Sequence, residues 1–309
     1  MNKLLWMRCF VRVVETGSFS AVARELDIGQ PNVSRHIAAL EADLGALLLH
    51  RSTRQLVVTP EGQRYYAQAR PALDLIAQAE ADVLGQHNPR GLLRVSCSPA
   101  LGTEIITPTL PAFLERYPEI EIELRLDDAY LDLVAEGIDV AIRGGELKDS
   151  ALRARRLGNS ERLCVASAGY VARHGAPAAM ADLARHQCIV YTLLAGSGAW
   201  QFGDGEVHVR GRLRVNNLEG VLRAALNGLG IGYLPRWMVA GHLRSGALVA
   251  VLAEHATICS PVNAVYAAAR LLPLRASVFI DHIADVFAAT PGFVVADVGA
   301  AGDRAVMRL

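Results

Sequence analysis

The chain has 309 residues, 52% of them hydrophobic and 20% charged, and its 31 basic and 31 acidic residues give a net charge of +0. This length suits two or three domains, and the apolar content excludes an intrinsically disordered chain. Residues 1–70 nevertheless hold nine Lys or Arg against six Asp or Glu, a surplus of three positive charges. A mildly basic N-terminal part is compatible with contact to nucleic acid.

Membrane and export signals are absent from the sequence pattern. No window reaches the length of an uncharged membrane span, and Arg8, Arg12 and Glu15 interrupt the first apolar residues. The five cysteines are scattered, odd in number and without the spacing of metal ligands. We therefore expect a cytoplasmic protein with reduced thiols, no cofactor, no metal and no membrane partner.

The first predicted elements are three helices within the first 44 residues. Apolar residues from Trp6 to Val14 recur at helical spacing and predict the first helix. Two short helices joined by a tight turn follow, with Ser18 or Ser20 as the cap of the earlier one. Pro31 suits the opening of the later helix, because a first helical position needs no backbone N–H bond. This arrangement predicts a helix–turn–helix.

The later helix of this pair has one apolar face, formed by Val33, Ile37 and Leu40. Its opposite face carries amide, small and arginine side chains, which match base edges and phosphates in a DNA major groove. An ordinary solvated helix face is the alternative. The residues that we expect to contact DNA from this motif are Ser20, Gln30, Pro31, Asn32, Ser34 and Arg35.

A hairpin and a long helix are predicted next. Two short apolar runs flank a polar tip, and Arg51 and Arg54 at this tip suit contact with phosphates or the minor groove. Thr59-Pro60-Glu61 then opens a long helix with a capping hydroxyl, a first-position proline and an acid in the first turn. Its heptad-like apolar seam predicts pairing with the same helix of a second chain. The expected dimer contacts are Tyr66, Leu73, Ile76 and Val83.

From Leu92 on, strands and helices alternate, which predicts an α/β architecture. Gly228, Gly230 and Gly232 resemble a dinucleotide loop only in composition, because they follow a predicted helix and open a strand. The sequence contains no phosphate-binding loop, no serine nucleophile between glycines and no histidine pair at metal-ligand spacing. We therefore expect no enzymatic activity and no catalytic residue.

Residues 1–62 closely resemble the winged helix–turn–helix of LysR-type transcriptional regulators, and the later chain resembles their effector-binding domain. Gly29 departs from the family pattern, which has Ser there, a stronger helix cap. The runs that carry the resemblance are Phe10–Phe19, Gln30–Ile37, Leu40-Glu41, Leu44-Gly45, Arg51–Arg54, Thr59–Gly62, Leu110–Pro118, Gly137–Arg143 and Gly228–Pro235.

The resemblance implies three parts: a DNA-binding domain over residues 1–62, a linker and dimerisation helix over 63–90, and an effector domain over 91–309. The last would contain two α/β subdomains arranged as in periplasmic binding proteins, about 91–161 with 266–290 and about 162–265. Such a regulator binds double-stranded DNA as a homodimer or dimer of dimers, at an interrupted palindrome.

The resemblance places a small-molecule effector, which we expect to be an organic acid, between the two subdomains. Ligands of α/β sheets bind at the carboxyl ends of strands, against helix N-termini. Simple helix capping by Ser98, Thr103 and Asn217 is an alternative that does not exclude binding. A small-molecule binder or amidase-like enzyme with a vestigial front domain is the other functional class. The expected effector contacts are Ser98, Gly102, Thr103, Arg143, Thr192, Trp200, Asn217 and Tyr233.

Overall fold

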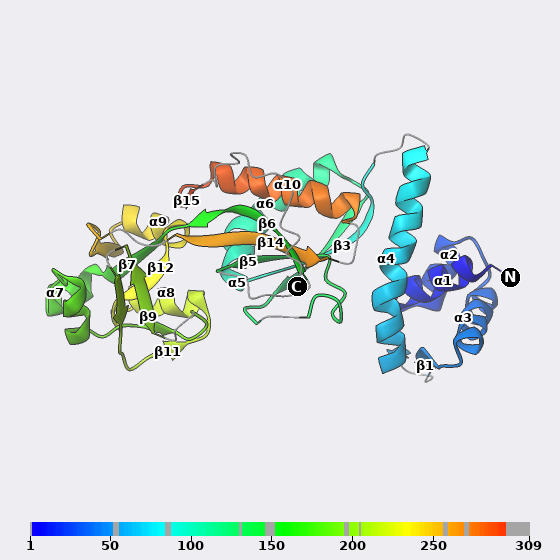
Figure 1. Cartoon of the computed structure of the whole chain (residues 1–309), viewed down its shortest axis with the longest axis horizontal. Helices are drawn as coiled ribbons and strands as arrows, with labels where there is room; N and C mark the ends of the chain where they lie inside the picture. The colour runs from blue at the N-terminus through cyan, green and yellow to red at the C-terminus, as the bar shows by residue number, and fades with distance from the viewer. Residues whose placement is uncertain are drawn as a thin grey trace, which may run out of the picture.

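The structure is a computed structural model that describes residues 2–51, 56–83, 88–129, 132–145, 152–194, 198–203, 205–255, 259–268 and 272–294. The molecule is elongated, with a small helical domain at one end and two α/β units following in line (Figure 1). One long helix stands between the helical domain and the first α/β unit. The helical end and the long helix contain α1 (Lys3–Thr16), α2 (Phe19–Glu25), α3 (Gln30–Leu44), β1 (Leu49–Arg51), β2 (Leu56–Val58) and α4 (Pro60–Val83).

Helices α1 to α3 share one apolar core and confirm the predicted helix–turn–helix. Ser18, and not Ser20, caps α2, because its hydroxyl accepts a backbone N–H at 3.2 Å. Asp27 in the turn has φ of 51°, a left-handed conformation that Asp adopts more readily than most residues. The residues that α3 buries completely are Val33, Ile37 and Leu40.

Strands β1 and β2 pair antiparallel, as expected for the hairpin, and two contacts fix them to the helices. The Glu41 carboxylate of α3 accepts the N–H groups of Leu48 and Leu49 at 2.8 and 3.1 Å. Thr59 caps α4 by accepting the Gly62 N–H at 2.9 Å. A Cβ atom at Gly62 would lie 2.1 Å from the Leu48 carbonyl oxygen, so this close approach of α4 to the hairpin requires glycine.

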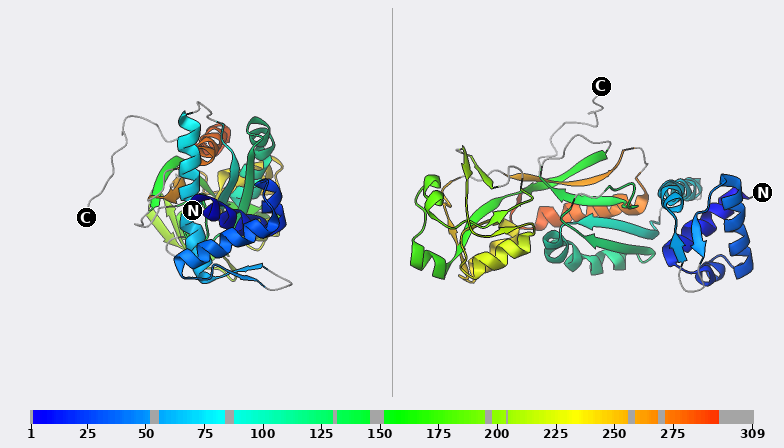
Figure 2. Two further views of the ribbon diagram at one scale, coloured as in Figure 1. Left: turned by 90° about the vertical axis from the view of Figure 1, so that its right-hand side faces the viewer. Right: turned by 90° about the horizontal axis from the view of Figure 1, so that it is seen from below.

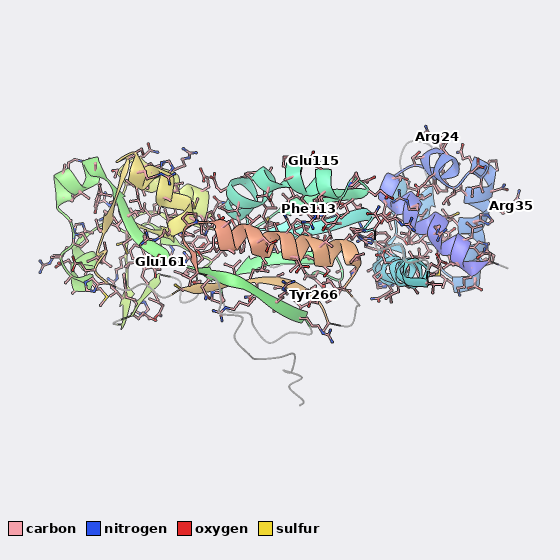
Figure 3. All side chains as sticks on the ribbon, turned by 90° about the horizontal axis from the view of Figure 1, so that it is seen from above. Arg24, Arg35, Phe113, Glu115, Glu161 and Tyr266 are labelled. Carbon is pink, nitrogen blue, oxygen red and sulfur yellow. The ribbon has the colours of Figure 1, made fainter. Side chains whose placement is uncertain are left out.

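The first α/β unit is formed by β3 (Gly91–Cys97), α5 (Pro99–Leu101), the π-turn η1 (Gly102–Ile106), α6 (Thr107–Arg116), β4 (Ile120–Leu126), β5 (Val140–Gly144), β6 (Leu152–Ser160), β14 (Ser260–Ala267), α10 (Leu274–Ala289) and β15 (Phe293–Val294). Its strands lie in the order β15-β6-β14-β5-β3-β4, with β3 parallel to β4 and β5. Helices α6 and α10 cover one face of the sheet, and Phe113, labelled in Figure 3, lies in the core beneath them. The ring centroids of Phe113 and Phe279 are 5.5 Å apart. Because side chains of a strand alternate, Val140 and Ile142 join this core while Ala141 packs on the other face.

The second α/β unit contains β7 (Arg162–Ser167), α7 (Ala168–His174), the 3-10 turn η2 (Met180–Arg185), β8 (Val190–Tyr191), β9 (Ala199–Phe202), β10 (Gly205–His208), β11 (Arg214–Val215), α8 (Leu218–Leu226), β12 (Gly232–Pro235), α9 (Arg236–Arg244) and β13 (Leu248–Val251). Strand β7 lies between β12 and β13, antiparallel to both. Val165 of β7 packs against α8, while its neighbours Cys164 and Ala166 pack with Trp200 of β9 on the opposite side.

The chain crosses between the two units twice, as Figure 2 shows in its right-hand view. The first crossing lies between Ser160 and Arg162. The return is earlier than expected, because β14 begins at Ser260 and already pairs there with Ser160 of β6. The expected boundary at residue 266 is therefore corrected to about 260, since β14 is one continuous strand of the six-stranded sheet.

Candidate functional site

The outward face of α3 lies at the end of the molecule farthest from the α/β units, where Figure 3 shows Arg35 pointing into solvent. Of the predicted DNA contacts on this motif, Ser34 is half-buried. Gly29, which departs from the family pattern, is the N-cap residue of α3 and makes no side-chain bond there. A helix of ordinary diameter, 10–12 Å, fits the roughly 12 Å major groove of B-DNA. The exposed predicted contacts are Ser20, Gln30, Pro31, Asn32 and Arg35.

The hairpin beside this helix contributes less that can be described. Arg51 is the last residue of β1, and its backbone pairs with Leu56. Arg54 lies outside the described residues, together with the rest of the tip at 52–55. DNA contact by Arg51 and Arg54 stays a prediction.

Helix α4 differs from the predicted dimer seam in its first half. Tyr66 is only 6% exposed, because it packs in the helical core of its own chain, so its assignment as a dimer contact is wrong. Leu73 also packs partly against that core. A heptad-like pattern does not distinguish a partner in the same chain from one in a second chain. Among the side chains of α4 that the structure describes, the exposed apolar ones, which we call the α4 stripe, are Leu75, Ile76, Ala79 and Val83.

A cavity of about 380 Å³ lies between the two α/β units, within the size range of small-ligand sites. One wall is made by the ends of β3, β5 and β14, and the other by β7, β9, β12 and the segment after β8. Three of the predicted effector residues line it, namely Ser98, Arg143 and Tyr233. Since the cavity spans both crossings of the chain, its shape depends on how the two units are hinged.

Of the other five, Gly102 and Thr103 are not among the lining residues. We expected a helix to open near Gly102 and Thr103, but it begins earlier, at Pro99. Thr103 is therefore inside the helical segment, where its hydroxyl donates to the Pro99 carbonyl oxygen at 2.9 Å. Gly102 is buried where a Cβ atom would lie 2.2 Å from the Leu126 side chain. The predicted contacts of Gly102 and Thr103 with an effector are thus not supported by the geometry.

Thr192, Trp200 and Asn217 lie around the cavity but are not among its lining residues. Trp200 is 1% exposed and stacks behind Tyr233, with ring centroids 5.3 Å apart. It therefore helps to hold the Tyr233 ring in its position in the cavity wall. Thr192 bonds to the carbonyl of Val215. Asn217 caps α8, as the alternative interpretation held.

The wall formed by the first unit carries one positive and one negative side chain, Arg143 and Asp128. Arg143 is 8% exposed and donates to the Asp127 carbonyl at 2.6 Å and to the Ser96 hydroxyl at 2.9 Å. Asp128 beside it accepts a bond from Asn217 of the second unit at 3.0 Å. Burial raises the pKa of the Asp128 carboxyl, an effect that Asn217 and Arg143 partly offset. The Asn217–Asp128 bond is a polar contact that joins the two units directly.

The opposite wall contains a charged residue that the sequence analysis missed. Arg162, the first residue of β7, lines the cavity with its guanidinium 5.7 Å from the Tyr233 ring centroid. It also donates to the Tyr233 carbonyl at 3.3 Å. Within the described residues no carboxylate lies within ion-pair distance of Arg162, and desolvation lowers the pKa of its guanidinium. A basic residue placed at the crossing between two units was the signal in the sequence.

Comparisons with known proteins fit this geometry. Residues 4–63 match the model of the bacterial regulatory helix-turn-helix protein, lysR family, and residues 86–288 match that of the LysR substrate binding domain. The chain is 36% identical over 281 residues to the HTH-type transcriptional regulator CrgA of Neisseria meningitidis serogroup C, covering 89% of this chain and 94% of the relative. It is 34% identical to the regulator DmlR of Escherichia coli K12, covering 91% and 94%. The solved structure of CrgA from Neisseria meningitidis superposes with a TM-score of 0.60 at 35% identity, covering 91% of this chain and 97% of that one.

Proposed function

Because the chain belongs to the LysR family of DNA-binding transcriptional regulators, with a helix–turn–helix and a substrate-binding domain, we propose that it binds an interrupted palindromic DNA site and responds to a small organic anion. The described part of the chain contains no helix long and apolar enough to cross a bilayer. An enzymatic function is excluded by the family, whose similar members are transcriptional regulators.

The palindrome follows from pairing of two chains. A two-fold symmetric dimer presents two copies of α3, and each reads one half of a symmetric site. The α4 stripe supports such a dimer, because Leu75, Ile76 and Val83 are 38%, 37% and 87% exposed on one helix of the single chain. Burying these side chains against a second α4 removes apolar surface from water. A dimer of dimers is compatible with the same contact.

The observation that carries the effector proposal is Arg162 in the cavity wall. Arg162 is half-buried, and a guanidinium that is partly shielded from water is costly unless an anion accompanies it. No described carboxylate lies within ion-pair distance of it, since the neighbouring Glu161 pairs with Arg236. Among the charged residues that line the cavity, Arg143 and Arg162 outnumber Asp128, so the site has a positive surplus. A carboxylate ligand provides the planar acceptor pair that a guanidinium binds best.

The rest of the cavity favours a ligand with a flat apolar body. The rings of Tyr191, Tyr233 and Trp237 line it, together with the side chains of Leu193 and Leu194. Trp237 is oriented by its indole N–H, which donates to the Ser160 hydroxyl at 3.1 Å. An aromatic carboxylate therefore matches the site better than a small aliphatic acid.

Isothermal titration calorimetry tests this proposal with a panel of aromatic and aliphatic carboxylates, each run beside its neutral amide. We expect an aromatic acid to bind, and Arg162→Met to weaken it about 10- to 100-fold while the apolar stem of the side chain is kept. Arg223→Ala on the exposed surface of α8 is the matched control, with unchanged affinity. Equal binding of acid and amide, or full affinity in Arg162→Met, would refute the anion assignment.

A further inference from the structure

A buried cluster of charged side chains joins the DNA-binding end of the chain to the first α/β unit. Arg70 of α4 donates to Asp139 at 2.8 Å and lies 3.3 Å from Glu15 of α1. Arg94 of β3 donates its backbone N–H to the same Asp139 oxygen at 2.9 Å. Each of these four side chains is at most 8% exposed, and two of them are positive and two negative. At the rim, Glu15 also pairs with Arg12 at 2.5 Å and Arg94 with Glu123 at 2.8 Å, so the charges stay balanced. We call Glu15, Arg70, Arg94 and Asp139 the junction cluster.

Tyr66 bonds to two members of the junction cluster. Its hydroxyl donates to Glu15 at 3.0 Å and accepts a bond from the Arg94 guanidinium. Its ring packs near Gly137, where a Cβ atom would lie 3.5 Å from the ring edge. Three segments therefore meet in one hydrogen-bonded group: α1 of the helix–turn–helix domain, α4, and the N-terminal ends of β3 and β5 in the six-stranded sheet. Arg70 adds bonds to the carbonyls of Gly137 and Leu92 at 3.2 and 2.5 Å.

The same two strands that carry the cluster also reach the effector cavity. Strands β3 and β5 are adjacent and parallel, and Ser96 pairs with Ala141 in their register. Arg94 on β3 and Asp139 before β5 stand at the cluster end. Ser98 after β3 and Arg143 on β5 line the cavity, four residues further along, a distance of roughly 13 Å at the rise of a β-strand. Strands paired in a packed core move as one body.

We propose that the junction cluster is the joint that couples the effector cavity to the DNA-binding domain of the same chain. This inference rests on the proposed function, in which the hinged cavity regulates DNA binding. A buried ion cluster is a directional contact that tolerates few arrangements, so it transmits a shift of β3 and β5 to α1 and α4. Arg275 of α10 provides a second contact to α4 by a bidentate pair with Asp74 at 3.1 and 2.5 Å.

Coupling between two sites is reciprocal, so DNA itself is the probe and no effector is needed. Hydrogen–deuterium exchange would be measured on the full chain with and without a DNA duplex selected in vitro on the wild type. In the wild type we expect DNA to slow exchange in α3 and to change it at least about fivefold around the cavity, at residues 96–101 and 142–145. In Asp139→Asn the protection of α3 is expected to remain while the change at the cavity is lost.

Two further variants keep the test decisive. Tyr66→Phe removes only the hydroxyl that joins Glu15 and Arg94, so it reports on the cluster even where Asp139→Asn does not fold. Arg155→Ala breaks an exposed ion pair with Asp281 elsewhere on the same unit and is expected to keep the wild-type response. The proposed coupling would be overturned by either of two results. One is a wild-type change in exchange around the cavity in folded cluster variants, and the other is no such change in the wild type. Failure of the effector proposal is seen separately, as the absence of anion binding in calorimetry.

Discussion

At the scale of single residues, Arg35 distinguishes base reading from general attraction to DNA. It is exposed on the outward face of α3, and a bidentate contact to a base supplies about 1–3 kcal/mol of discrimination. Arg35→Ala is expected to lose that much specific binding to the selected duplex in fluorescence anisotropy. Arg185→Ala, which removes an 86% exposed charge of η2, serves as control and should bind normally. Wild-type specific affinity in a folded Arg35→Ala chain would exclude the contact.

Gly62 tests how tightly α4 is joined to the hairpin. An added methyl group would lie 2.1 Å from the Leu48 carbonyl, so Gly62→Ala is expected to destabilise the chain by about 1–3 kcal/mol or more. Gly241→Ala in α9 meets no atom within 4 Å and should be neutral or slightly stabilising, since Ala favours helix. Urea denaturation of both variants gives the comparison. A Gly62→Ala chain as stable as Gly241→Ala would show that the hairpin can move away freely.

Single residues also mark how far the sequence could predict the site. The α3 face followed from helical spacing alone, because 100° per residue separates Arg35 from Val33 without knowledge of any neighbour. The cavity residues depended on where a helix begins and on contacts between distant segments. Thr103 was therefore predicted to lie at the start of a helix that in fact begins at Pro99. Arg162 was missed because the residue it packs against, Tyr233, is distant in the sequence.

At the scale of elements, α4 shows the limit of periodicity. Its start at Pro60 was predicted from a cap and a first-position proline and is confirmed. Its expected end near Gln86 lies outside the described residues, which follow the helix as far as Val83. The seam itself splits, because Tyr66 packs within the chain while Ile76 is exposed. The spacing of apolar residues predicts that one face of a helix is buried, but it does not predict which surface buries that face.

Negative charges placed in the α4 stripe test whether it forms the dimer interface. Leu75→Asp combined with Ile76→Asp is expected to give monomers in sedimentation velocity at micromolar concentration, because two carboxylates per chain would be buried without partners in the dimer. Leu229→Asp replaces a 57% exposed leucine of the second unit and should stay dimeric. A dimer that survives the double substitution would place the interface elsewhere.

At the scale of the whole molecule, Asp128 makes contact between the two units sensitive to pH. Burial raises its pKa above the unfolded value of 3.8, so the folded chain holds this proton to higher pH than the unfolded chain does. Below pH 3.8 both states are protonated and the group has no effect; above it, ionisation costs stability until the folded pKa is passed. Asp128→Asn should therefore gain stability over the wild type as the pH rises from 4 to 7.5, measured by urea denaturation. A difference that shrinks with rising pH would contradict this sign.

The order of the domains could be predicted from sequence, whereas their junctions could not. Alternating strands and helices identify an α/β part wherever they occur, but the return of the chain at Ser260 depends on pairing between β14 and β6. The junction cluster unites residues separated by more than a hundred positions, Glu15 and Asp139 among them, and each reads in the sequence as an ordinary surface charge. Long-range ion pairs leave no local pattern.

Selection of DNA on the whole chain of 309 residues would show whether a pair of chains reads a palindromic site. A random duplex library would be enriched on the wild type, and the winning sequence would be footprinted and titrated with salt. We expect two half-sites related by a dyad, spaced by one helical turn of about 10–10.5 base pairs or a multiple of it, and a steep fall of log K with log salt. No enriched sequence, or a lone half-site bound with little salt dependence, would contradict it.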